Sequence, residues 1–171
     1  IDSIVQSISK KFHIINGPLL VQMIISNDNP YVIEFSARMG GGTKYKLIEV
    51  LTGFNVMKAY VELVTNEKPL VSLKKQFNYA HLNYCYATDG VFSKLYGFEE
   101  LKRKGIIYDY FKYKTEGSVI NKAETSSDRI AGYLITANTF EELVRKEQIA
   151  NHSIKILSDT GEDIMRHDLL F

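Results

Sequence analysis

Two extended runs joined by turn residues limit what this chain can fold into more than any other feature. Residues 19–26 and 31–38 flank Asn27-Asp28-Asn29-Pro30, whose residue types favour turns, so we predict a β-hairpin. Alternate positions carry apolar or amphipathic side chains that share one face: Leu19, Val21, Met23, Ile25, Tyr31, Ile33, Phe35 and Ala37. A one-residue slip would misplace this set, which predicts a turn of three or five residues with Gln22 opposite Glu34.

The opposite face of the predicted hairpin carries Gln22, Glu34, Ser36 and Arg38. Hard cations such as Mg²⁺ prefer oxygen donors of this kind, and they keep positions for water and phosphate. A nearby arginine offsets negative charge on a phosphate or carboxylate. The plainer interpretation is a solvated sheet face, on which Glu34 and Arg38 form an exposed ion pair worth little. Alternating polarity is typical of any half-buried strand, so the pattern alone leaves both interpretations open.

Three glycines, Gly40, Gly41 and Gly42, lie between the second run and a helix predicted over residues 44–51. Glycine lets the backbone approach a ligand closely, and amides at the start of the next helix can receive an anion. The order of residues matches neither a Walker loop, since Thr43 precedes Lys44, nor G-x-G-x-x-G. A flexible turn is an equally good interpretation.

The rest of the chain predicts an α+β protein in two parts. Amphipathic spacing predicts helices over residues 2–13 and 56–66, and the pattern breaks after Lys68-Pro69. From residue 77 onward short strands and single helices alternate, so we divide the chain near residue 74 into domains 1–74 and 75–171. The predicted strands there are 79–86, 106–113, 129–137 and 153–157, and the predicted helices are 98–104 and 139–149.

Composition excludes several classes of protein. The 21 Lys and Arg residues balance 20 Asp and Glu, with no basic patch, which argues against nucleic-acid binding. A 45% hydrophobic fraction argues against disorder, while no apolar run is long enough to span a membrane. The sequence shows no secretory signal, and its single cysteine, Cys85, cannot form an intramolecular disulfide. We therefore expect the chain in the reducing cytoplasm, with no membrane as partner. Because the chain starts at Ile1, we expect either that the polypeptide is processed or that it begins inside a longer gene product.

The sequence also resembles a known family. Gly17-Pro18-Leu19-Leu20-Val21-Gln22, Val32-Ile33-Glu34-Phe35-Ser36-Ala37-Arg38 and the glycine run are similar to the C-terminal part of ATP-grasp enzymes. Within that superfamily the likeness is to carbamoyl-phosphate-synthase-like proteins and L-amino acid ligases. Gly97-Phe98-Glu99-Glu100-Leu101 and Arg129-Ile130-Ala131-Gly132-Tyr133 resemble their small C-terminal domain. The resemblance implies the C-terminal half of an ATP-grasp domain, an antiparallel sheet with helices, followed by a small α+β subdomain.

The resemblance also implies roles for the polar face. Glu34 would bridge the magnesium (or manganese) ions on the phosphates of ATP, the co-substrate. Gln22 would be another metal ligand, at a position where many members have Glu and carbamoyl-phosphate synthases have Gln. Ser36 would be a third ligand, although this position is usually Asn. Arg38 would lie near the transferring phosphoryl group or substrate carboxylate, and the glycine run would shape the acceptor-substrate site.

In the reaction of this family, a small-molecule carboxylate attacks the γ-phosphate of ATP, and an amine or thiol then displaces phosphate from the acyl phosphate. Metal and arginine stabilise charge, so the protein needs no nucleophilic side chain. Family members grip the nucleotide with a lobe that precedes this segment. We therefore expect this chain to require the N-terminal part of the same enzyme as its partner and to be inactive alone.

Two other interpretations remain open. One is a noncatalytic small-molecule-binding or assembly module with a degenerate ATP-grasp fold, which Ser36 in place of Asn favours slightly. The other is a structural ferredoxin-like domain with an unrelated partner.

Several other polar residues are expected to have structural roles. The single Cys85 is expected to be structural. The same is expected of the four histidines, His13, His81, His152 and His167. The cluster Ser126, Ser127, Asp128 and Arg129 is predicted to be a capped loop.

Overall fold

The computed structural model describes residues 1–121, 123 and 125–170, and divides into two compact units, Ile1–Lys74 and Lys75–Phe171. The first unit holds a two-stranded antiparallel hairpin with three helices, and the second holds two three-stranded antiparallel sheets with helices. The α+β class with antiparallel sheets is therefore confirmed. No helix among the described residues is both long and apolar enough to cross a membrane.

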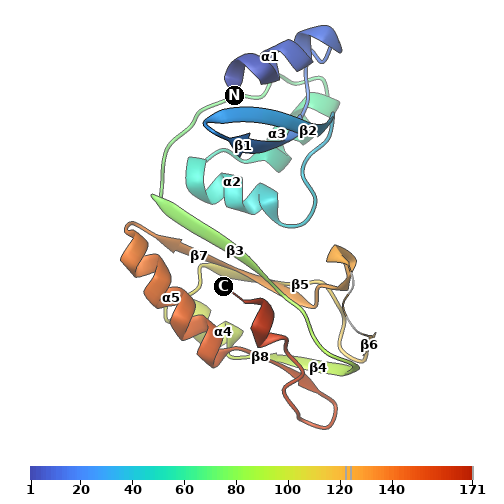
Figure 1. The fold of residues 1–171 in the computed structure, drawn as a ribbon, viewed down its shortest axis with the longest axis vertical. Coiled ribbons are helices and arrows are strands. Elements are labelled where there is room, and N and C mark those ends of the chain that lie inside the picture. The colour runs from blue at the N-terminus through green and yellow to red at the C-terminus, as the bar shows by residue number, and fades with distance from the viewer. Residues whose placement is uncertain (122, 124, 171) are drawn as a thin grey trace. The chain divides into compact units, whose positions relative to one another are not determined.

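In the first unit, helix α1 (Asp2–Lys11) packs on the hairpin formed by β1 (Leu20–Ser26) and β2 (Asn29–Ser36). Asp2 lies in the first turn of α1 and Lys10 in its last turn, where each charge complements the helix dipole. The rings of Phe12 and Phe35 meet edge to face, with centroids 4.7 Å apart. Helices α2 (Lys44–Thr52) and α3 (Val56–Val64) follow the hairpin, and α2 lies on the side opposite α1 (Figure 1).

The hairpin turn differs from the prediction. Its two central residues, Asn27 and Asp28, have φ angles of 49° and 62°, and Ser26 pairs with Asn29. Positive φ at both positions is typical of the type I′ turn, whose twist matches that of the strands. The predicted turn of three or five residues is therefore wrong.

A β-bulge nevertheless brings Gln22 opposite Glu34, as predicted. The register shifts between Gln22 and Met23, because Glu34 pairs with Gln22 and Val32 pairs with Met23, which leaves Ile33 as the extra residue. An extra residue in one strand changes the alternation in the same way as an odd-numbered turn would. The sequence pattern thus predicts the pairing correctly and its cause wrongly.

The bulge also changes which side chains share a face near the turn. Val32 pairs with Met23, and Tyr31 pairs with Ile24, so Tyr31 lies with the set that contains Gln22 rather than with the apolar set. Tyr31 and Ile24 are 59% and 56% exposed. The predicted apolar face is therefore wrong beyond the bulge, whereas Val21 and Phe35 pair before it as expected.

The second unit contains two sheets of order β3-β7-β5 and β6-β4-β8. Helix α5 packs on β7 and β3, and helix α4 contacts β5. Strand β4 was not among the elements predicted from the sequence. The strands are β3 (Tyr79–Cys85), β4 (Gly90–Tyr96), β5 (Asp109–Lys112), β6 (Val119–Ile120), β7 (Ala131–Ala137) and β8 (Lys155–Ser158), and the helices are α4 (Phe98–Arg103), α5 (Phe140–Ser153) and the 3₁₀ turns η1 (Ser126–Asp128) and η2 (His167–Leu169).

Most of the hydrophobic core belongs to the second unit. Every residue of the central strand β7 is buried, and Phe92, Phe98 and Ile156 belong to the same core cluster as Tyr133 of that strand. Each fully buried side chain of this size contributes about 1.5–3 kcal/mol. By contrast, Thr43, Val50 and Ala59 are the only buried residues of residues 1–74, all of which the structure describes. The first unit therefore has only a small buried core, and every residue of its hairpin strands is exposed or half-buried.

Candidate functional site

Three oxygen-bearing side chains lie on one face of the hairpin, at the end far from the turn. Gln22 is directly opposite Glu34, and Ser36 follows Glu34 by two positions in β2. Directly opposed residues of antiparallel strands have Cβ atoms about 4.5–5.5 Å apart, and alternate residues of one strand point the same way. Gln22 and Glu34 are exposed, and Ser36 is half-buried. The pairing therefore gathers one carboxylate, one amide and one hydroxyl.

Arg38 is placed differently from the prediction. Strand β2 ends at Ser36, and the backbone N–H of Arg38 donates a hydrogen bond to the Ser36 carbonyl over 2.8 Å. The guanidinium Nη1 donates to the carbonyl of Met39 over 2.9 Å. Within the described part of the chain, Arg38 and Glu34 form no ion pair, so the exposed pair that the sequence allows is absent. Arg38 therefore lies just beyond β2, and the bond to Met39 is its one guanidinium hydrogen bond to the described residues.

The glycine run joins this strand end to helix α2. Gly42 has a φ of 70°, a left-handed backbone conformation that residues other than glycine adopt only at a cost in free energy. A methyl group at Gly41 would meet open space, whereas at Gly40 it would approach Lys44 Cδ to 3.1 Å. The loop therefore exposes backbone at Gly41 while it packs closely at Gly40.

The donor set of this face fits a magnesium ion that arrives with a phosphate group. No group of three or more His, Cys, Asp and Glu residues able to hold a metal occurs among the described residues. Mg²⁺ is usually held by one or two carboxylates, while water and phosphate supply the other ligands. One carboxylate, Glu34, with the neutral oxygens of Gln22 and Ser36 matches such a partial site.

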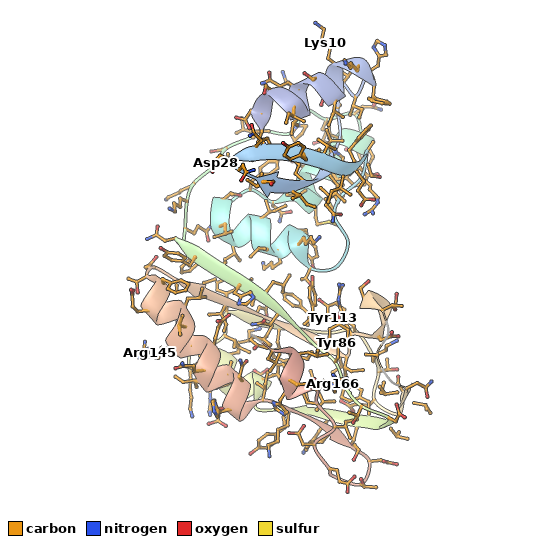
Figure 2. The ribbon with its side chains drawn as sticks, in the orientation of Figure 1. Lys10, Asp28, Tyr86, Tyr113, Arg145 and Arg166 are labelled. Carbon is orange, nitrogen blue, oxygen red and sulfur yellow. The ribbon has the colours of Figure 1, made fainter. Side chains whose placement is uncertain are left out.

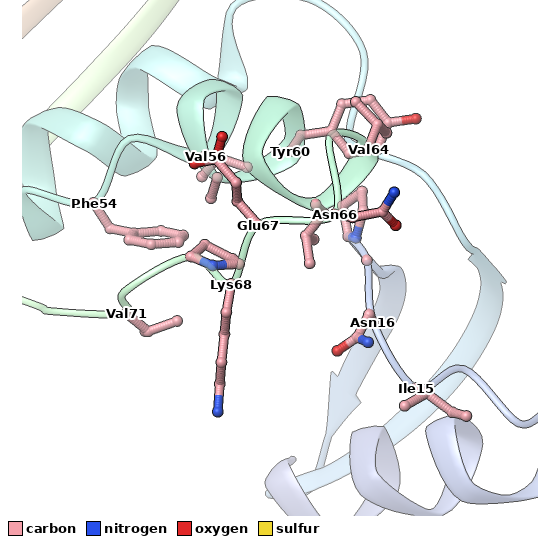
Figure 3. A pocket seen from close by; sticks show the side chains of 15 residues that line it. Ile15, Asn16, Phe54, Val56, Tyr60, Val64, Asn66, Glu67, Lys68 and Val71 are labelled. Carbon is pink, nitrogen blue, oxygen red and sulfur yellow. The ribbon is translucent and has the colours of Figure 1, made fainter.

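A pocket of about 970 Å³ lies elsewhere in the first unit (Figure 3). Phe54, Tyr60 and Val64 supply part of its wall, and its charged lining residues are Glu67 and Lys68. None of the residues predicted for the site lines it. The pocket is therefore separate from the polar face of the hairpin.

In the second unit, two polar contacts join helix α5 to the β3-β7-β5 sheet. The His81 Nδ1 atom contacts the carboxylate of Glu147, and Tyr133 donates from its hydroxyl to Asn151 Oδ1 over 2.6 Å. Burial lowers the pKa of His81, which favours a neutral imidazole that donates to Glu147. Burial also raises the pKa of the Cys85 thiol to about 12, as fits a structural cysteine.

The cluster of residues 126–129 is a capped loop, as predicted. The Asp128 carboxylate accepts from Thr125 N and Oγ1, over 2.8 and 3.0 Å, and Thr125 Oγ1 accepts from Ser127 N. Nothing in the local sequence indicates what Arg129 contacts. Its guanidinium carbon lies 3.8 Å from the centroid of the Tyr84 ring, a contact between residues far apart in the chain.

Comparison with known proteins identifies the fold. No family profile and no curated protein sequence matches the chain. Among solved structures, phosphoribosylglycinamide synthetase from Anaerococcus prevotii is similar over 91% of this chain and 40% of its own, with a TM-score of 0.78 and 22% identity. The chain has the fold of the C-terminal part of an ATP-grasp enzyme.

Other ATP-grasp structures give the same result. L-amino acid ligase from Bacillus licheniformis aligns with a TM-score of 0.73 and 22% identity, over 91% of this chain and 40% of its own. The biotin carboxylase domain of 2-oxoglutarate carboxylase from Hydrogenobacter thermophilus, solved with MgADP and bicarbonate, aligns with a TM-score of 0.70 and 16% identity, over 96% of this chain and 36% of its own. The chain thus spans about 40% of the length of the first structures it matches.

Proposed function

We propose that this chain is the C-terminal part of an ATP-dependent ligase. In the proposed reaction, the enzyme converts a small-molecule carboxylate to an acyl phosphate and transfers the acyl group to an amine or thiol. The observation that carries the proposal is the position of Glu34, which lies opposite Gln22 and just before the glycine run in an ATP-grasp fold. The similar biotin carboxylase domain was solved with MgADP, which supports ATP as co-substrate and magnesium as metal in this proposal.

In this proposal, Gln22, Glu34 and Ser36 would hold the magnesium or manganese ion that accompanies ATP. When bound, the metal supplies charge neutralisation and alignment of the phosphates. Arg38, with guanidinium donors beyond the one bonded to Met39, would bind the transferring phosphoryl group or the substrate carboxylate. The glycine run, with open space at Gly41, would let the acceptor substrate approach the backbone.

The proposed mechanism requires no nucleophile from the protein. Cys85 is fully buried, and its raised pKa keeps it protonated at neutral pH, so it is unsuited to covalent catalysis. The direct partner in this proposal is the N-terminal part of the same enzyme, which would supply the grip on the nucleotide. The open hairpin, exposed on both strands, is compatible with completion by further structure.

A noncatalytic module that binds a small molecule is the second candidate. It is favoured by Ser36, whose hydroxyl is a weaker metal ligand than the Asn amide usual in the family at this position. The two candidates differ in one measurable property, because only the ligase couples ATP cleavage to substrates.

Release of phosphate by the longer protein tests the proposal. The assay supplies ATP and Mg²⁺ with a panel of carboxylates and amines or thiols. We expect phosphate release that requires both substrates, and none from residues 1–171 alone. Phosphate release from ATP by the 171-residue chain itself, or binding of small molecules by the longer protein without any ATP cleavage, would contradict the proposal.

A further inference from the structure

Arg129 in the second unit is held in a fixed orientation by two tyrosines. Its guanidinium stacks on the ring of Tyr84 at 3.8 Å, and its Nε donates a long hydrogen bond of 3.4 Å to the hydroxyl of Tyr86. Stacking on an aromatic face orients the plane of the guanidinium as well as attracting its charge. The side chain is also half-buried, so these contacts and its surroundings restrict the conformations that it can adopt.

A third tyrosine, Tyr113, packs beside this pair. Its ring lies 6.2 Å from the ring of Tyr84, and a methyl group added at Gly132 would come within 3.3 Å of its hydroxyl. Gly132 therefore leaves the space that Tyr113 occupies over the central strand β7. Figure 2 shows Tyr86 and Tyr113 at the same end of the β3-β7-β5 sheet. We call Arg129, Tyr84, Tyr86 and Tyr113 the arginine–tyrosine cluster.

The two terminal nitrogens of Arg129 have no protein partner in the described part of the chain. The adjacent carboxylate, Asp128, is bonded instead to Thr125. The Tyr84 hydroxyl is also buried, and it lacks a hydrogen-bond partner among the described residues. An unsatisfied buried polar group in a native fold calls for an explanation, and a missing water or ligand is a common one.

From these contacts we infer that the arginine–tyrosine cluster binds an oxyanion, a carboxylate or a phosphate group, through the terminal nitrogens of Arg129. A planar guanidinium matches two oxygens of either group, and charge-assisted pairs of this kind are about twice as strong as neutral hydrogen bonds. The inference rests on residues of the second unit alone. It holds or fails independently of the ligase proposal, which depends on Glu34.

Calorimetric titration of the 171-residue chain tests the inference. One arm uses inorganic phosphate and the other uses acetate, so the preferred oxyanion is identified directly. We expect saturable binding of one of them, weakened about tenfold or more by Arg129→Lys, which keeps the charge but removes the fork of donors. Tyr86→Phe removes only the bond that orients Nε, so it should weaken binding by a smaller factor.

Arg145→Ala is the matched control, because Arg145 is an exposed arginine of α5 (Figure 2). It should leave the affinity unchanged. Absence of saturable binding for both anions would overturn the inference, and so would equal weakening by Arg145→Ala and Arg129→Lys. If circular dichroism shows that Arg129→Lys is unfolded, Tyr86→Phe decides, and unchanged affinity in that variant then overturns the inference.

Discussion

Replacing Glu34 by Gln is expected to lower ATP-dependent phosphate release by the longer protein by a factor on the order of a hundred to a thousand. Gln has nearly the same size and keeps one carbonyl oxygen, so the change mainly removes the negative charge. Glu34 is the only carboxylate on the face formed with Gln22 and Ser36, and no neighbour on that face replaces its charge. The measurement is initial-rate phosphate release at saturating ATP and magnesium.

The matched control for this prediction is Glu67→Gln in the same unit. Glu67 is exposed and lies outside the hairpin, so the same chemical change there should alter the rate less than about twofold. A Glu34→Gln variant with an unchanged rate, in a protein that does release phosphate, would show that the metal is held elsewhere.

Replacing Gly97 by Ala is expected to destabilise the second unit by about 3 kcal/mol or more. Gly97 precedes helix α4 with a φ of 83°, which disfavours any side chain. An added methyl group would also lie 2.4 Å from the Ser153 carbonyl oxygen and 3.3 Å from the Ile154 Cα atom. These are backbone atoms, so neither can move aside by a change of rotamer. Urea unfolding followed by circular dichroism measures the loss.

Gly161→Ala separates the two contributions. Gly161 has the same φ of 83°, but a methyl group there would meet no atom within 4 Å. It should therefore cost only the conformational part, about 1–2 kcal/mol. Equal destabilisation by the two variants would show that the chain relaxes around Gly97 and that the close approach to Ser153 has no energetic weight.

The local pattern of residues was sufficient to predict the hairpin and its polar pairing. Alternation of side chains and the turn residues around Asn27 depend on neighbours in the sequence, and so does the pairing of Gln22 with Glu34. The bulge at Ile33 was not predictable, because an odd turn and an even turn with a bulge satisfy the same alternation. That ambiguity misplaced Tyr31 on the apolar face.

Features that depend on distant parts of the chain could not be predicted. The stacking of Arg129 on Tyr84 and the contact of His81 with Glu147 join residues from different elements. The sequence does not predict strand β4, because a register shift between Phe92 and Lys94 interrupts its alternation, and its pairing partner β8 lies far along the chain. The predicted strand also runs two residues too far, to Arg38, because β2 ends at Ser36 and the backbone N–H of Arg38 bonds the Ser36 carbonyl.

Binding of Mn²⁺ together with ATP tests the central claim, that the face of Gln22, Glu34 and Ser36 holds the metal of the nucleotide. Electron paramagnetic resonance of Mn²⁺ reports its binding to the longer protein whether or not the reaction proceeds. We expect tight, ATP-dependent binding of Mn²⁺ that Glu34→Gln weakens at least about tenfold and Glu67→Gln leaves unchanged. Equal Mn²⁺ affinity in the wild type and in Glu34→Gln, with ATP bound in both, would contradict the account.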